Sequence, residues 1–258
     1  MITSPGAMQP RPPIRQALAT PGRWLPTGPA AWLARCCEEA GSTPAVLRAF
    51  PAIGRRLGRG PLPDCEPAGG YGWTVDDAGR ARLLVAASAS RDEDSLTALL
   101  EQLYRHGDAA ERRGVLRALD VLGLGERGLP LLRDALRTND ARLVAAAAGG
   151  EYAARMLPDA DLAQAVLKCL FIGVPLAAVA AIPGRITPEL ARMTADFARE
   201  RVAAGRDVPA DAWVILAREP DAVTAAGLPA ELESPVTGRR AAARRFFAAR
   251  PTVSPERT

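Results

Sequence analysis

The sequence predicts an all-α protein, built from antiparallel helix pairs in a HEAT-like α-solenoid or an irregular helical array. Apolar residues recur at spacings of three and four along most of the chain, and the alternating pattern of β-strands is absent. Helix start and stop signals are frequent. Residues 99–109 and 131–141 also share apolar pairs and a polar turn at a constant offset of 32 residues. Two such copies are typical of stacked helical hairpins.

The domain organisation follows from length and composition. With 258 residues, 48% of them hydrophobic, the chain is long enough to bury one good-sized core. Residues 1–28 are proline-rich and are predicted to be disordered, and they contain no apolar stretch typical of a signal peptide. We expect a helical domain over residues 29–219, interrupted by a Gly/Pro-rich loop at 58–79. Residues 220–258 are expected to form a Pro/Arg-rich tail with a short helix near 239–250.

The net charge of +4 raises the question of nucleic-acid binding. However, Lys168 is the only lysine among 33 basic residues, and an arginine excess of this kind is typical of a GC-rich genome. The arginines also gather in the loop and the tail rather than on a central helix. We therefore expect no nucleic-acid partner. The alternative, a nucleic-acid-binding helical repeat protein, requires a continuous arginine stripe on one face.

Cysteine and histidine usage restricts the chemistry. Cys36, Cys37, Cys65 and Cys169 have no CxxC spacing, which argues against a zinc site and favours reduced thiols in a cytoplasmic protein. The single histidine, His106, lies in a polar turn without a nucleophile motif. Most general-base and metal mechanisms are thereby disfavoured. No cofactor, metal or catalytic residue is expected, and the protein is interpreted as non-catalytic.

The clearest helix signals lie between Gln164 and Trp213. Thr187, followed by Pro188 and Glu189, is a strong helix start, and Gly205 is a natural stop. The spacing predicts a buried stripe of apolar residues on this helix, made by Leu190, Met193, Thr194 and Phe197.

The preceding stretch, residues 165–182, is apolar enough to suggest a membrane span. Lys168 lies inside it, and Gly173 and Pro175 divide it into pieces too short to cross a bilayer. We therefore expect two short buried helices.

Several polar residues in and near this region are candidate contacts for a ligand or partner. Asp196 and Glu200 share one helix face, where they could hold a hard cation or be neutralised by Arg192 and Arg199 in an ion-pair ladder. Arg201 continues the expected buried stripe. An inward arginine needs an anionic partner, which Asp196, Asp211 or a bound anion could supply.

Two further residues complete the candidate set. Lys168 could act as a reactive amine or belong to an ordinary polar helix face. Asn139 lies in a polar turn, where capping of the next helix is the simplest role.

Seven short motifs carry a resemblance to a known family. They are FPAIGRRLGRGPL (50–62), GWTVDDAGRARLLV (72–85), RTNDARLVAAA (137–147), VLKCLFIGVPL (166–176), PELARM (188–193), ERVAAGR (200–206) and VPADAW (208–213). Over most of residues 30–219 the chain resembles the EboA-domain family. The resemblance implies a helical protein without an established biochemical activity. It also implies a gene set with a prenyltransferase-like membrane protein and sugar-phosphate-isomerase-like and hydrolase-like enzymes, linked to moving secondary-metabolite precursors out of the cytoplasm.

The chain departs from that family at several positions. Relatives have a histidine and a tryptophan where this chain has Arg199 and Val202, and an asparagine where Thr187 stands. They carry a Trp-Asn pair at Leu162 and Ala163. These changes put in doubt any activity carried over from the family.

Residues and resemblance together favour a non-catalytic helical binding or adaptor protein in secondary-metabolite processing or precursor export. Its expected partners are pathway proteins or an anionic metabolite, with a membrane prenyltransferase-like protein as one such partner. The main alternative is an enzyme or small-molecule binder that uses Lys168, Asp196, Glu200 and Arg201. The full set of candidate contacts comprises Asn139, Lys168, Arg192, Asp196, Glu200 and Arg201.

Overall fold

The computed structural model describes residues 14–63, 65 and 70–251. Over these ranges the chain forms α-helices and short 3-10 turns without a β-strand, and one isolated bridge joins Pro61 to Thr74. The predicted all-α class is confirmed.

The chain divides into two compact units, residues 1–135 and 136–258, and the division falls within α7. The sequence predicts a single helical domain over 29–219, so this boundary was not anticipated. The helices of the first unit are α1 (Ile14–Ala19), α2 (Thr27–Glu38), α3 (Thr43–Leu57), α4 (Val75–Ser88), α5 (Glu93–His106), α6 (Ala109–Leu122) and α7 (Leu129–Arg137). The second unit contains α8 (Ala141–Ala148), α9 (Glu151–Met156), α10 (Asp159–Ile172), α11 (Pro188–Ala203), α12 (Trp213–Leu216), α13 (Pro220–Ala225) and α14 (Thr237–Ala248).

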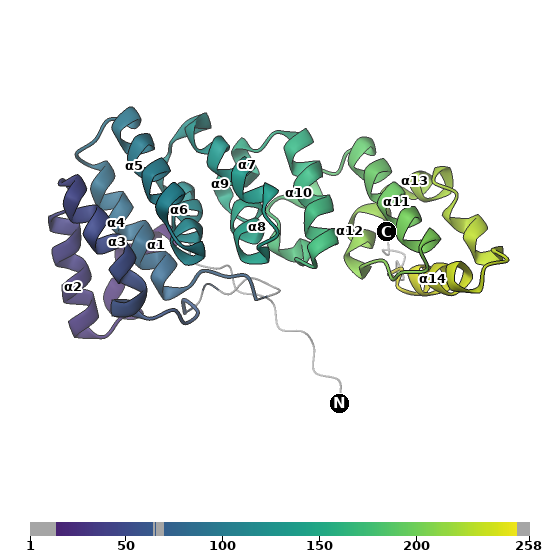
Figure 1. Cartoon of the computed structure of the whole chain (residues 1–258), viewed down its shortest axis with the longest axis horizontal. Helices are drawn as coiled ribbons and strands as arrows, with labels where there is room; N and C mark the ends of the chain where they lie inside the picture. The colour runs from purple at the N-terminus through teal and green to yellow at the C-terminus, as the bar shows by residue number, and fades with distance from the viewer. Residues whose placement is uncertain (1–13, 64, 66–69, 252–258) are drawn as a thin grey trace, which may run out of the picture. The chain divides into compact units, whose positions relative to one another are not determined.

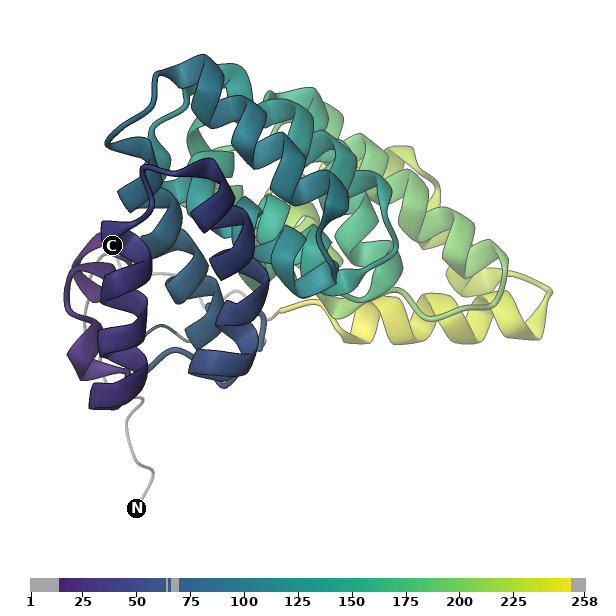
Figure 2. The same ribbon diagram turned by 60° about the vertical axis from the view of Figure 1, so that its left-hand side comes forward.

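Helix α4 is the centre of the first unit. It packs between α3 and α6, and the three helices lie side by side in Figure 1 and Figure 2. Two glycines permit this close approach. A Cβ atom at Gly79 would lie 2.4 Å from Leu57 Cδ1, and a Cβ at Gly114 would lie 2.4 Å from Arg80 Cδ. Both glycines therefore lie inside helices and allow a neighbouring side chain to pack directly against the helix backbone.

Side-chain caps fix where the helices begin. Asp92, Asp108, Asp140 and Thr187 each accept a backbone N–H in the first turn of the helix that follows. Asp108 and Asp140 are the two polar turn residues related by the 32-residue offset, and they begin α6 and α8. The repeated turn is thus a repeated helix cap.

The N-terminal prediction needs a correction. Residues 1–13 lie outside the described residues, but residues 14–28, which were also expected to be disordered, contain α1 and the beginning of α2. Leu18 is buried, its carbonyl accepts a hydrogen bond from Arg82 Nη1 at 2.6 Å, and Trp24 Nε1 donates to Ala17 O. The bond from Arg82 joins this segment to α4, and the bond from Trp24 orders it internally, although its prolines suggested disorder.

The Gly/Pro-rich loop is shorter than predicted. It follows Leu57 and ends at Thr74, because Thr74 and Asp77 form a capping box that begins α4 at Val75. Within the loop, the amide of Leu62 donates to Trp73 O and that of Val75 donates to Gly60 O. Trp73 is buried, so this aromatic residue holds the loop against the core.

Helix α11 confirms the predicted start and stop. Thr187 accepts from the amide of Leu190, and Gly205 has a φ of 68° with its N–H donating to Val202 O. The buried face is rotated from the predicted stripe, however. Met193 and Phe197 are only partly buried, and the most buried positions are Ala191, Thr194, Ala195, Ala198 and Val202.

The apolar stretch at 165–182 forms the C-terminal part of α10 and a 3-10 turn at Leu176–Ala178, where two helices were expected. Gly173, with a φ of 79°, ends α10. Within the described residues, no helix combines the length and the apolar character that crossing a membrane requires.

The C-terminal segment is part of the second unit. Helix α14, drawn in yellow in Figure 2, packs against α11 and the 3-10 helix at Leu228–Glu233. Trp213 is 2% exposed, stacks on Phe246 with ring centroids 4.6 Å apart, and donates from Nε1 to Phe246 O at 2.9 Å. The predicted short helix is present at slightly earlier bounds, and it belongs to the hydrophobic core.

Candidate functional site

Among the predicted contacts, Lys168 and Asn139 lie together. Lys168 Nζ on α10 donates to Asn139 Oδ1, in the turn between α7 and α8, at 2.6 Å. Asn139 is exposed and Lys168 is half-buried. The lysine is thus held by a neutral amide, and the cap of α8 is Asp140 rather than its neighbour.

The carboxylates of α11 are neutralised by a neighbouring arginine. Arg192 pairs with Glu189 at 2.7 Å and with Asp196 at 2.8 Å, along a side of the helix open to water. The hydrogen bond from Arg192 lowers the pKa of Glu189. Glu200 is exposed. The ion-pair ladder weighed from the sequence is present at Arg192 and Asp196.

Arg201 does not have the expected carboxylate partner. Its side chain is half-buried, lies over the Phe197 ring at 5.8 Å, and donates from Nε to the carbonyl of Asp207. Asp196 is held by Arg192, and Asp211 accepts from the amide of Leu176 at 2.6 Å. The physical reason is the rotation of the α11 core face, which places Arg201 beside the core rather than within it. As contacts for a ligand or partner, the six residues remain a prediction.

Metal-binding groups are not brought together in the described part of the chain. No group of three or more histidine, cysteine, aspartate or glutamate residues there has the geometry of a metal site. His106 is exposed at the end of α5, and none of the four cysteines, all within the described residues, forms a disulfide.

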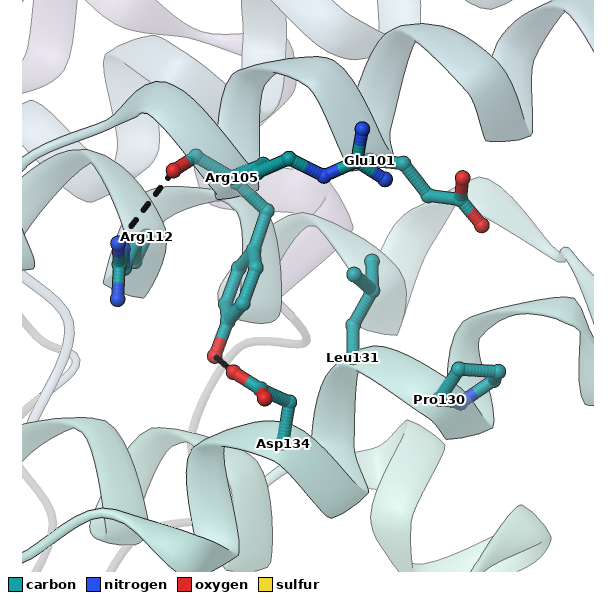
Figure 3. Close-up of a pocket in the computed structure, with 7 residues that line it drawn as sticks. Glu101, Arg105, Arg112, Pro130, Leu131 and Asp134 are labelled. Carbon is teal, nitrogen blue, oxygen red and sulfur yellow. Dashed lines mark hydrogen bonds between the residues drawn. The ribbon is translucent and has the colours of Figure 1, made fainter.

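The structure does contain a groove that the sequence did not indicate. It has a volume of about 420 Å³ and lies in the first unit, where the end of α5 and the beginning of α6 meet α7 (Figure 3). We refer to it as the Tyr104 groove. It is lined by Glu101, Tyr104, Arg105, Arg112, Pro130, Leu131 and Asp134.

Tyr104 is the fixed centre of this groove. Its hydroxyl donates to Asp134 Oδ2 at 3.0 Å, and the guanidinium of Arg112 lies over its ring at 5.6 Å. Arg112 is itself held by the carbonyl oxygens of Gly107 and Arg105. Burial and the neighbouring Asp134 carboxylate raise the pKa of Tyr104, so the phenol, which is neutral at pH 7 in any case, stays protonated further into the alkaline range.

The lining combines charge with an apolar wall. Leu131, Pro130 and the Tyr104 ring supply the apolar surface. Arg105 and Arg112 supply the cations, and Glu101 and Asp134 supply two carboxylates, of which Asp134 accepts from Tyr104. The volume lies within the range of small-molecule sites, about 300–1,000 Å³. The sequence held one signal for this groove. At the 32-residue offset Asp108 is repeated as Asp140, but Tyr104 corresponds to Leu136, so the tyrosine is a departure from the repeat.

A buried ion network lies beside the core of the same unit. Asp76 and Arg80 on α4 are both fully buried and pair at 2.6 Å. Arg113 on α6 reaches Asp76 at 3.5 Å and Asp77 at 2.9 Å, and it also donates to the Thr74 hydroxyl. Burial raises the pKa of Asp77, because the loss of water outweighs the attraction of Arg113. The network fixes α4 against α6.

The comparison with protein families decides the affiliation of the chain. Residues 66–217 match the family model described as "Metabolite traffic protein EboA". The match covers more than half of the chain. The chain belongs to the EboA family. No curated protein and no solved structure matches it.

The region matched to the EboA family includes the Tyr104 groove and the ion network. Most of the positions at which a departure from the EboA pattern was expected have a structural role in this chain. Leu162, Ala163 and Val202 are buried, Thr187 caps α11, and Arg199 is exposed.

Proposed function

We propose that this EboA-family protein binds an anionic metabolite in the Tyr104 groove and presents it to other proteins without converting it. The observation that carries the proposal is the groove itself, whose lining combines two arginines, an apolar wall and a fixed tyrosine. The description of the family as a metabolite traffic protein supports a role in handling a small molecule. The ligand class is an organic anion with an apolar body.

Binding is favoured by groups that are already in place. Tyr104, Arg112 and Asp134 are connected before any ligand arrives, which reduces the entropy lost on binding. The side chain of Arg105 is exposed at the groove and lies outside these contacts, so it can contact an anion. Guanidinium groups suit carboxylates and phosphates because they donate two parallel hydrogen bonds.

The titratable side chains of the groove support the proposal that the protein does not convert its ligand. General-base chemistry near neutral pH requires a group with a pKa close to the working pH. Tyr104 is shifted away from that range, and His106 is not part of the groove lining. The carboxylate of Asp134 is already engaged by the tyrosine hydroxyl.

The biological setting is also a proposal. We place the protein in the cytoplasm, in secondary-metabolite processing or precursor export, with pathway enzymes and a prenyltransferase-like membrane protein as its protein partners. Nucleic acid is not proposed as a ligand. In the C-terminal segment, Arg239, Arg240 and Arg245 are engaged with Glu231, Ser234 O and Asp207, respectively.

The proposal is tested by native mass spectrometry of the purified protein after incubation with a small-molecule extract of cells that carry the gene. We expect a discrete adduct of one metabolite on the wild-type protein. Arg105→Glu reverses the charge at an exposed groove position and should reduce the adduct at least about tenfold, which corresponds to about 1.4 kcal/mol.

The matched control is Arg155→Glu, because Arg155 is likewise exposed and lies outside the groove. It should retain the adduct. Equal loss in both variants would indicate unspecific charge attraction, and the absence of any adduct on the wild-type protein would refute the proposed function.

A further inference from the structure

Arg80 has hydrogen-bonding capacity that the protein does not use. Its side chain is fully buried, and Nη1 is satisfied by Asp76. Nε and Nη2 are also buried, but they have no hydrogen-bond partner among the described residues. The guanidinium lies over the Phe50 ring at 5.5 Å, which offsets only part of the cost of burying two unpaired donors.

A second arginine shares the space that Arg80 faces. A Cβ atom at Gly54 would lie 3.4 Å from Arg80 Nη2, 2.9 Å from Arg59 Nε and 3.4 Å from Arg59 Nη2. Two guanidinium groups therefore pack against α3 at Gly54, and they fit there only because residue 54 has no side chain. Two positive groups gathered at one position repel each other, and an anion bound between them relieves that repulsion.

The backbone holds Arg59 in this position. Gly58, at a φ of 92°, ends α3 and turns the chain, a conformation that residues with a side chain rarely adopt. The carbonyl of Gly60 is fixed by the amide of Val75 at 2.9 Å. The Arg59 side chain is 58% exposed, and its ion pair with Asp108 is long, at 4.0 Å. Arg59 can therefore move aside and admit a ligand from solvent.

We propose that the surface of α3 at Gly54 is an anion site, where the Arg59 side chain moves aside and a phosphate group binds between it and Arg80. A tetrahedral oxyanion has enough acceptor oxygens to satisfy both free donors of Arg80 while it also contacts Arg59. Arg80 keeps its pair with Asp76, so binding does not require the buried network to break. The site is distinct from the Tyr104 groove and does not depend on the function proposed for that groove.

The experiment measures binding of inorganic phosphate by isothermal titration calorimetry and its effect on the Tm of the full chain, against chloride at equal ionic strength. The wild-type protein should bind phosphate saturably and show a higher Tm. Gly54→Ala should remain folded, because the added methyl group meets the movable end of Arg59 and alanine favours a helix. It fills the site, so phosphate affinity should fall at least about tenfold.

Three further measurements separate this site from its surroundings. Arg59→Ala should weaken phosphate binding as Gly54→Ala does. Arg55→Ala removes the same charge from an exposed position on α3 and should leave binding unchanged, as should Arg105→Glu in the Tyr104 groove. Tighter binding of glycerol phosphate than of inorganic phosphate would identify a phosphorylated metabolite as the ligand, whereas equal binding would identify free phosphate. No saturable binding by the wild-type protein, or undiminished binding by Gly54→Ala, would overturn the proposal.

Discussion

Asp76→Ala is expected to lower the free energy of unfolding of the first unit by about 3–5 kcal/mol, the cost typical of removing one partner from a buried ion pair. Asp76 accepts from Arg80 Nη1 and the Thr74 hydroxyl and pairs with Arg113, all at the junction of α4 and α6. Its loss leaves the fully buried Arg80 without the carboxylate that it pairs with and weakens the start of α4. Urea denaturation followed by circular dichroism measures the change.

Glu93→Ala is the matched control in the same unit. Glu93 also pairs with an arginine, Arg127, at 3.0 Å, but both side chains are exposed and water screens the pair. We expect a far smaller loss of stability for this variant. Comparable losses for Asp76→Ala and Glu93→Ala would contradict the central place of the buried network in the first unit.

Trp213→Ala is expected to destabilise the second unit by about 3–5 kcal/mol, as is typical for the removal of a buried aromatic side chain. The indole is stacked on Phe246 and also holds the end of α14 through a hydrogen bond to its backbone. Thermal unfolding measures the loss. Limited trypsin digestion adds a local measurement, because Arg244 and Arg245 on α14 should become much more rapidly cleaved.

The neighbouring Val214→Ala serves as the control, since Val214 is 43% exposed on the same short helix. It should change the stability by less than about 1 kcal/mol and leave α14 protected. If α14 were cleaved equally fast in the wild-type protein and both variants, its assignment to the hydrophobic core would be wrong.

Local signals in the sequence predicted much of the fold. The hydroxyl–Pro–Glu start at Thr187 and the stop at Gly205 defined α11, because caps and positive-φ glycines act within a single turn. Gly79 shows the limit of such signals. It was interpreted as part of a loop, but it lies within α4 and permits close contact with Leu57, which is a property of the partner helix.

The burial of charged residues could not be predicted in the same way. Asp76 and Arg80 have the spacing of an ordinary exposed ion pair, and only the packing of α3 and α6 against α4 removes them from water. For Arg201 the prediction was wrong in the opposite direction, because an inward side chain was expected and the structure places it half-buried beside the core. The alanines at 191, 195 and 198 form the buried face of α11, but alanine gives a weak hydrophobic signal beside Phe197.

The Tyr104 groove was missed because its lining comes from three helices. Tyr104 and Asp134 are 30 residues apart, and their hydrogen bond depends on how α5 packs near α7. The predicted contacts instead followed single helices, where spacing alone places residues on one face. The structure joins only some of them, as in the Lys168–Asn139 and Arg192–Asp196 pairs.

The most direct test of the proposed role is the chemical fate of the captured metabolite. The compound recovered from the wild-type protein is incubated again with a stoichiometric amount of fresh protein, and the mixture is followed by mass spectrometry over hours. We expect the compound to remain bound and to be released unchanged on denaturation. Conversion to a product by the wild-type protein, and not by Arg105→Glu, would contradict the proposal and establish the Tyr104 groove as an active site.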